Sequence, residues 1–133
     1  MFPRPGVPVA ESRKRILVAD DDPAIAKMLS RLLGRDYDVV IAEDGAAAVA
    51  LATREPLPDL ALLDIMMPVL DGLIVAQKLR DHPSLKKLPI IFITARGTPM
   101  DVIRGIQAGA RSYITKPFTL EDVRDKVAKA LRT

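Results

Sequence analysis

The stretch ILVADDDP at residues 16–23 decides the fold of this chain. Its four apolar residues indicate a buried strand of a parallel sheet, and three carboxylates follow where that strand ends. Pro23 suits the first turn of a helix, with Asp22 as the residue that caps it. A strand that leads through an acidic turn into a helix predicts the first unit of an α/β fold.

The same pattern recurs along the chain. Further short apolar runs end at Asp64, at Thr94 and directly before Lys116. We therefore expect a single-domain, doubly wound α/β sandwich with a five-stranded parallel sheet. The expected strands lie at about 16–19, 37–42, 60–64, 89–94 and 112–115. The expected helices lie at about 23–34, at 45–54, from the 65–72 loop to about 80, at 98–109 and at 119–132.

Five polar residues should meet at one edge of this sheet. In such sheets ligands bind outside the carboxyl ends of the strands, which is where Asp20, Asp21, Asp64, Thr94 and Lys116 fall. Crowded carboxylates repel one another and need a cation, and hard oxygen ligands suit Mg²⁺, which also binds phosphate oxygens. The lysine and the hydroxyl are then left to hold an anion. The sequence predicts a joint site for a carboxylate, a divalent metal and a phosphoryl group.

Composition limits the class of protein. The length of 133 residues suits one domain, and 49% hydrophobic residues can fill its core. The lack of cysteine excludes disulfides and thiolate metal sites. There is no signal-peptide pattern and no run of about 20 apolar residues, so we expect a cytoplasmic protein without a membrane segment.

The basic excess of the chain lies at its N-terminus. The formal net charge is +3, and residues 1–15 hold four basic residues against one acidic, which leaves 16–133 balanced. We favour a solvated leader over a nucleic-acid arm, so DNA binding by this chain is not expected. Pro3, Pro5 and Pro8 predict a flexible or extended tail over 1–14, followed by one domain over 15–132.

Several motifs carry a family resemblance. The chain resembles the response-regulator receiver domains of two-component phosphorelay signalling, the family of the chemotaxis regulators. The resemblance covers about residues 14–132 and implies a flavodoxin-like fold with strand order 2-1-3-4-5. The matching motifs are ILVADDDP at 16–23, LLDIMMPVLDG at 62–72, PIIFITA at 89–95, GA at 109–110 and YITKPF at 113–118.

The resemblance implies roles for the acidic residues. Asp64 would be the phosphoacceptor, whose carboxylate attacks a phosphohistidine or a small acyl phosphate. Asp20, Asp21 and Asp64 would hold Mg²⁺, or Mn²⁺ in its place, together with the backbone carbonyl of Met66. The phosphoryl donor would be a sensor histidine kinase or a phosphotransfer protein. Apart from this self-phosphorylation and a slow autodephosphorylation, the resemblance implies no enzymatic activity.

It also implies a switch. Lys116 would pair with the phosphoryl oxygens, and its peptide bond to Pro117 is often cis in the family. Thr94 would move to bind the phosphoryl group, and Tyr113 would follow it inward, which changes the face formed by the fourth helix, fifth strand and fifth helix. Met66 and Arg96 lie where the family tunes the lifetime of the aspartyl phosphate. Neither residue can act as a base towards water, so slow hydrolysis is expected.

The output of the switch is less defined by the sequence. Residues 95–133 hold eight basic against four acidic residues, which fits an acidic output partner and an ordinary solvated surface equally well. A phosphorylation-dependent homodimer is a further expectation. The chain stops after its last expected helix, as either a stand-alone receiver or a receiver cut from a longer regulator would.

Two rival functions fit part of the pattern. One is a degenerate receiver that binds its partner without phosphorylation, which the intact Asp21, Asp64, Thr94 and Lys116 disfavour. The other is a phosphohydrolase with Asp64 as nucleophile. Haloacid-dehalogenase-type phosphatases place a second aspartate two residues later, where this chain has Met66.

Overall fold

Five parallel strands form one sheet in the computed structural model, which describes residues 13–95 and 109–132. Their order is β2-β1-β3-β4-β5, and every neighbouring pair is parallel. The strands are β1 (Arg15–Ala19), β2 (Asp38–Ala42), β3 (Leu60–Asp64), β4 (Ile90–Thr94) and β5 (Ser112–Thr115). Both the parallel sheet and its strand order are therefore confirmed.

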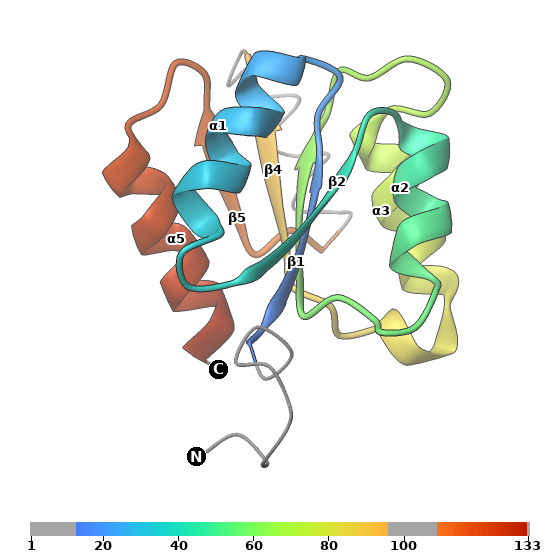
Figure 1. Cartoon of the computed structure of the whole chain (residues 1–133). Helices are drawn as coiled ribbons and strands as arrows, with labels where there is room; N and C mark the ends of the chain where they lie inside the picture. Colours follow the sequence, from blue (N-terminus) through green and yellow to red (C-terminus); the bar gives the residue numbers. More distant parts are fainter. Residues whose placement is uncertain (1–12, 96–108, 133) are drawn as a thin grey trace.

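Helices cover both faces of the sheet (Figure 1). Within the described ranges they are α1 (Pro23–Leu33), α2 (Gly45–Ala52), α3 (Gly72–Asp81), the 3₁₀-helix η2 (Pro83–Leu85) and α5 (Leu120–Arg132). α1 and α5 lie on one face, and α2 and α3 on the other. The doubly wound sandwich is confirmed, and the helix expected at 98–109 lies outside the described residues.

The sheet separates two apolar cores. The central strands β3 and β4 are buried along their whole length, so their side chains serve both faces. Leu63 and Phe92 pack on the side of α2 and α3, whereas Leu62 and Ile91 pack on the side of α1 and α5. Continuous apolar runs are typical of strands that are covered on both faces. These apolar runs hold β3 and β4 in the centre of the sheet and so determine where the carboxyl ends of the two strands lie.

Aspartates start the first three helices. Each accepts a hydrogen bond from a backbone N–H of the first turn, which satisfies one of the donors that a helix start leaves unpaired. The pairs are Asp22 with Ala24 at 3.0 Å, Asp44 with Ala47 at 2.8 Å and Asp71 with Ile74 at 2.9 Å. The capping role expected for Asp22 is thus confirmed.

No helix in the described part of the chain is long and apolar enough to cross a membrane.

Candidate functional site

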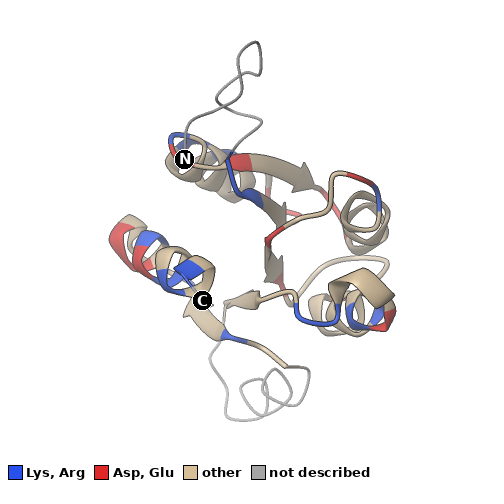
Figure 2. Ribbon diagram, turned by 90° about the horizontal axis from the view of Figure 1, so that it is seen from below, with Lys and Arg blue, Asp and Glu red and all other residues tan. Residues whose placement is uncertain are grey.

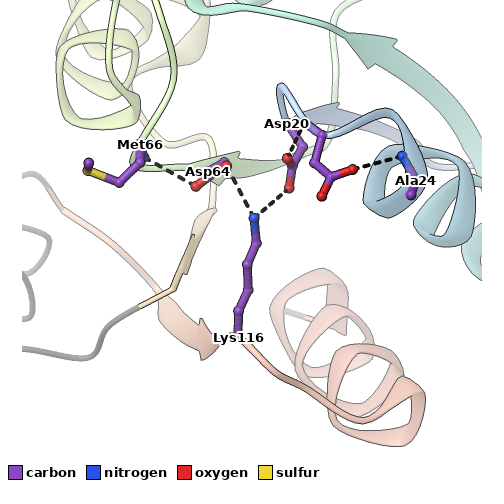
Figure 3. A network of polar contacts seen from close by, with 6 residues as sticks. Asp20, Ala24, Asp64, Met66 and Lys116 are labelled. Carbon is purple, nitrogen blue, oxygen red and sulfur yellow. Dashed lines mark hydrogen bonds and ion pairs between the residues drawn. The ribbon is translucent and has the colours of Figure 1, made fainter.

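The carboxyl edge of the sheet collects the predicted residues. Asp20 directly follows β1, Asp64 ends β3, Thr94 ends β4 and Lys116 directly follows β5. β1 pairs with β3 in a register that sets Ala19 opposite Leu63, so the next residue of each strand is an aspartate at the same level. Asp20, Asp64 and Lys116 point toward one another across this edge (Figure 3).

Three carboxylates crowd together here. Asp20, Asp21 and Asp64 each offer an oxygen, and these oxygens all lie within 4.8 Å of one another. Asp20 and Asp64 are buried, with 1% and 3% of their surface exposed, whereas Asp21 faces solvent. Buried carboxylates at this spacing repel strongly unless a cation lies between them.

Lys116 supplies only part of the compensating charge. Its Nζ lies 3.2 Å from Asp20 Oδ2 and 3.2 Å from Asp64 Oδ2. The contact with Asp64 is a hydrogen bond, but Asp20 Oδ2 is a buried oxygen that has an ion pair without a well-directed hydrogen bond. One ammonium against three carboxylates leaves two negative charges. The oxygen donor set therefore fits a hard divalent cation such as Mg²⁺.

The surroundings shift the pKa values of the central pair. Burial, and after it the charge of Asp20, raise the pKa of Asp64, while Lys116 and the Met66 N–H lower it, and the balance of these effects puts the pKa at about 6. Burial lowers the pKa of Lys116, but attraction to Asp64 and Asp20 outweighs it, so the pKa of this ammonium lies above its usual value. At neutral pH the site thus holds an ionised Asp64 beside a charged Lys116.

Backbone contacts orient both buried aspartates. The Asp22 N–H donates to Asp20 Oδ1 at 2.9 Å, which leaves Oδ2 of Asp20 toward Lys116. The Met66 N–H donates to Asp64 Oδ1 at 3.2 Å, so the backbone of Met66 lies at the mouth of the site while its side chain is exposed. Its carbonyl remains a predicted metal ligand.

The expected switch residues lie beside this cluster. Thr94 is buried at the end of β4, and the Lys116 N–H donates to its carbonyl oxygen at 2.7 Å. Tyr113 is half-buried in β5, and its ring centroid lies 6.2 Å from that of Phe92. The Lys116–Pro117 peptide bond is cis, as the resemblance implied. Arg96 lies outside the described residues.

Sequence reasoning missed how the loop between β3 and α3 is held. A Cβ on Gly72 would collide with the backbone of Asp64 and Ile65, so α3 starts in direct contact with the strand that carries the phosphoacceptor candidate. A Cβ on Gly45 would collide with Leu70. The glycines themselves were the available signal, but only the fold shows what approaches them.

A groove opens beside the carboxylates. It encloses about 670 Å³, and its lining includes Asp20, Asp21, Lys27, Arg31 and Pro68. A larger hollow of about 1060 Å³ lies between α1 and α5 and contains none of the three carboxylates. The smaller groove therefore adjoins the carboxylate cluster through Asp20 and Asp21, while Asp64 and Lys116 lie outside its lining.

Comparison with known proteins defines the class. Residues 16–128 match the family model of the response regulator receiver domain. The DNA-binding dual master transcriptional regulator RpaA of Synechocystis sp. is 43% identical over 119 residues, which cover 89% of this chain and 49% of that protein. The DNA-binding response regulator MtrA of Mycolicibacterium smegmatis is 40% identical over 121 residues, with 90% and 51% covered.

The solved structures agree. The chemotaxis protein CheY4 of Vibrio cholerae superposes with a TM-score of 0.85 at 29% identity, covering 90% of this chain and 99% of that one. The chain therefore belongs to the response regulator receiver domain family of two-component signalling. It spans about half the length of the two curated relatives named above.

Proposed function

We propose that this receiver domain accepts a phosphoryl group on Asp64, in a reaction that depends on Mg²⁺. The observation that carries the proposal is the position of Asp64, whose carboxylate lies among two further carboxylates and 3.2 Å from the Lys116 ammonium. An Asp64 oxygen would bond to phosphorus while the bond from phosphorus to the donor's histidine nitrogen, or to an acyl oxygen, breaks. Family membership supports a signalling role rather than turnover of a substrate.

The metal would be held by Asp20, Asp21, Asp64 and the Met66 carbonyl. The buried Asp20 oxygen without a hydrogen bond supports this assignment, and Mn²⁺ also suits an oxygen site. When bound, Mg²⁺ would supply positive charge that stabilises the phosphoryl oxygens.

Lys116 and Thr94 would hold the phosphoryl group. Lys116 would exchange its contact with the Asp64 carboxylate for the phosphoryl oxygens, as a compact point charge. Thr94 would donate its hydroxyl, and Tyr113 would follow inward. This moves the face formed by the segment 98–109, β5 and α5, a two-state change driven by new charge.

The partners follow from this role. The phosphodonor would be a sensor histidine kinase or a phosphotransfer protein, and the output partner would bind the switched face, or a second copy would bind there as a homodimer. Figure 2 shows basic and acidic residues interspersed along α5, and Lys126 pairs with Asp122 at 3.1 Å. This mixture favours an ordinary solvated surface over a site for an acidic partner. We assign 15–132 to the receiver domain and 1–14 to a tail.

The test is phosphorylation by a small donor. Acetyl phosphate with Mg²⁺ should add one phosphoryl group to the wild type in intact-mass spectra and none to Asp64→Asn. An adduct of full yield on Asp64→Asn would overturn the assignment. Steady turnover of a chromogenic phosphate ester would instead favour the phosphohydrolase.

A further inference from the structure

The loop between β3 and α3 contains a strained residue. Val69 has a φ of 72°, and the Leu70 N–H donates to the Pro68 carbonyl at 2.9 Å across it. A hydrogen bond from residue i+2 back to residue i with positive φ at the central residue is a γ-turn of the rare, strained kind. For a β-branched side chain this backbone is a genuine outlier.

The neighbouring contacts explain why the chain turns at this position, but they do not explain why the residue in the turn is a valine. The Met67 N–H donates to the Ile65 carbonyl at 3.2 Å, and the Gly72 N–H donates to the same carbonyl at 2.9 Å. These two hydrogen bonds tie both ends of the loop to the end of β3. Leu70 lies against Gly45 with no room for a Cβ there. Glycine would adopt the same backbone at position 69 without the steric cost of a Cβ, and asparagine tolerates a positive φ better than a β-branched residue does. The fold therefore requires the turn, while the valine side chain only adds strain to it.

The Val69 side chain also adds little to the core. It is 77% exposed, and the nearby Met66 is 72% exposed. Pro68, between them, is exposed and lines the groove that contains Asp20 and Asp21. Met66, Pro68 and Val69 thus form an apolar rim beside the carboxylates. Strained residues that persist without a structural benefit point to a functional use of the side chain.

The proposed function determines what must cover this rim. A donor's phosphohistidine has to bring its phosphorus into contact with Asp64. A standard protein interface covers about 800 Å² per partner, a disc of roughly 16 Å radius. Val69 lies five positions after Asp64, which is at most about 18 Å of extended chain, and the turn shortens this path. An interface of this size around Asp64 can therefore cover Val69, whereas acetyl phosphate is too small to form such an interface.

We propose that Val69 is a recognition residue for the protein phosphodonor, and that its exposed side chain packs against apolar residues beside the donor's phosphohistidine. This inference rests on the proposed function and adds the chemistry of the partner's surface. The strain is then a cost in the free protein that the contact with the donor offsets.

The experiment compares two classes of phosphodonor on the same variants. The protein donors are the phosphorylated histidine kinases and phosphotransfer proteins encoded in the same genome, and the small donor is acetyl phosphate. Val69→Gly and Val69→Asn should lower the kcat/KM of transfer from the best protein donor by about tenfold or more, as expected for losing burial of a valine side chain. Both should keep the wild-type rate with acetyl phosphate. Val69→Gly should also raise the melting temperature.

Val69→Ile is the matched control. It keeps both the strain and the apolar side chain, so it should retain wild-type transfer from both donors. Unchanged protein transfer in Val69→Gly and Val69→Asn would overturn the inference, and so would an equal loss with both donors, which would indicate a distorted loop. Transfer from acetyl phosphate but from no protein donor would overturn it while leaving the proposed function standing. Failure of acetyl phosphate on the wild type would refute the proposed function itself.

Discussion

The side chains of Asp64 and Lys116 meet at 3.2 Å although 52 residues separate them and β4 lies between their strands. The same ammonium lies 3.2 Å from Asp20, so one lysine holds two buried carboxylates that would otherwise repel. A phosphoryl group on Asp64 would offer oxygens to the same ammonium. The contact thus stabilises the resting site and, under the proposed function, places Lys116 where a phosphorylated site would need it.

The buried Asp64 should make the metal-free protein less stable as pH rises. Burial and the nearby charge of Asp20 together raise the pKa of Asp64 from 3.8 to about 6, so between these values the folded protein keeps a proton that the unfolded chain has lost. The stabilising contribution is therefore complete below about pH 4 and is lost as pH rises to about 6. The shift of about two pH units corresponds to roughly 2–3 kcal/mol in the free energy of unfolding.

Urea unfolding of the wild type and Asp64→Asn across pH 4–7 measures this contribution. Other carboxylates titrate in both proteins, so the difference between them isolates Asp64. The stability of Asp64→Asn relative to the wild type should grow with pH and level off above about pH 6. Asp81→Asn, at an exposed position, controls for loss of a carboxylate in general. If the difference in unfolding free energy between the two proteins stays constant with pH, ionisation of Asp64 does not destabilise the folded protein.

Adjacent aspartates should differ in their effect on Mg²⁺ binding. Asp21 contributes an oxygen to the carboxylate cluster, whereas Asp22 uses its oxygen to cap α1. Asp21→Ala should weaken Mg²⁺ binding in calorimetry by at least about tenfold, because outer contacts of metal sites already have that effect. Asp22→Ala should bind Mg²⁺ nearly as the wild type but lose about 1 kcal/mol of stability with its cap. If Asp21→Ala and Asp22→Ala lose Mg²⁺ affinity equally, the assignment of Asp21 rather than Asp22 to the metal is wrong.

Switching should depend on Thr94 and reach Tyr113. With beryllofluoride as a mimic of the phosphoryl group, amide NMR signals should move mainly in residues 95–133. The ring of Tyr113 lies next to Phe92, two residues before Thr94 in β4, which gives Thr94 a short path to it. Thr94→Ala should still bind beryllofluoride but lose most of the distant shifts. Changes confined to the loops around Asp21 and Asp64 would contradict the proposed switched face.

Much of the placement of the site residues was predictable because it depends on the parallel direction of the strands. Apolar runs that end in Asp64 and Thr94 mark buried parallel strands, and the carboxyl ends of such strands meet at one edge. The cap at Asp22 was visible for a similar reason, since an aspartate before Pro23 has a local role. These features are set by residues that are neighbours in sequence or by a rule that holds for the whole fold class.

The rest depends on contacts between distant residues. Nothing in MPVLDG at 67–72 signals a positive φ at Val69, because a valine is the residue least suited to it. The turn follows from Leu70 lying against Gly45 of α2. Likewise, the Arg80 guanidinium donates to the carbonyls of Lys86 and Gly109, at 2.7 and 2.6 Å, and so links α3 to the segment before β5. Such contacts have no local pattern.

The lifetime of the aspartyl phosphate should be set by what lies over Asp64. Water must approach the phosphorus in line with the bond to Asp64, and a side chain that orients this water accelerates hydrolysis. The Met66 N–H bonds to Asp64 Oδ1, so the Met66 side chain begins at the mouth of the site. Methionine offers no strong hydrogen bond to water. Arg96, which the family resemblance places on the other side of the approach, cannot accept a proton at neutral pH. We therefore expect slow autodephosphorylation.

The double variant Met66→Asn with Arg96→Glu tests this expectation. An amide and a carboxylate at these positions can both hold water by hydrogen bonds, so the phosphorylated form should decay on the order of tenfold faster than the wild type. Decay is followed by intact mass after the small donor is removed, with Mg²⁺ kept constant. The exposed substitution Ile74→Gln, on α3, is a control that should leave the lifetime unchanged. If the double variant decays no faster than the wild type, water access past these two side chains does not limit the lifetime of the signal.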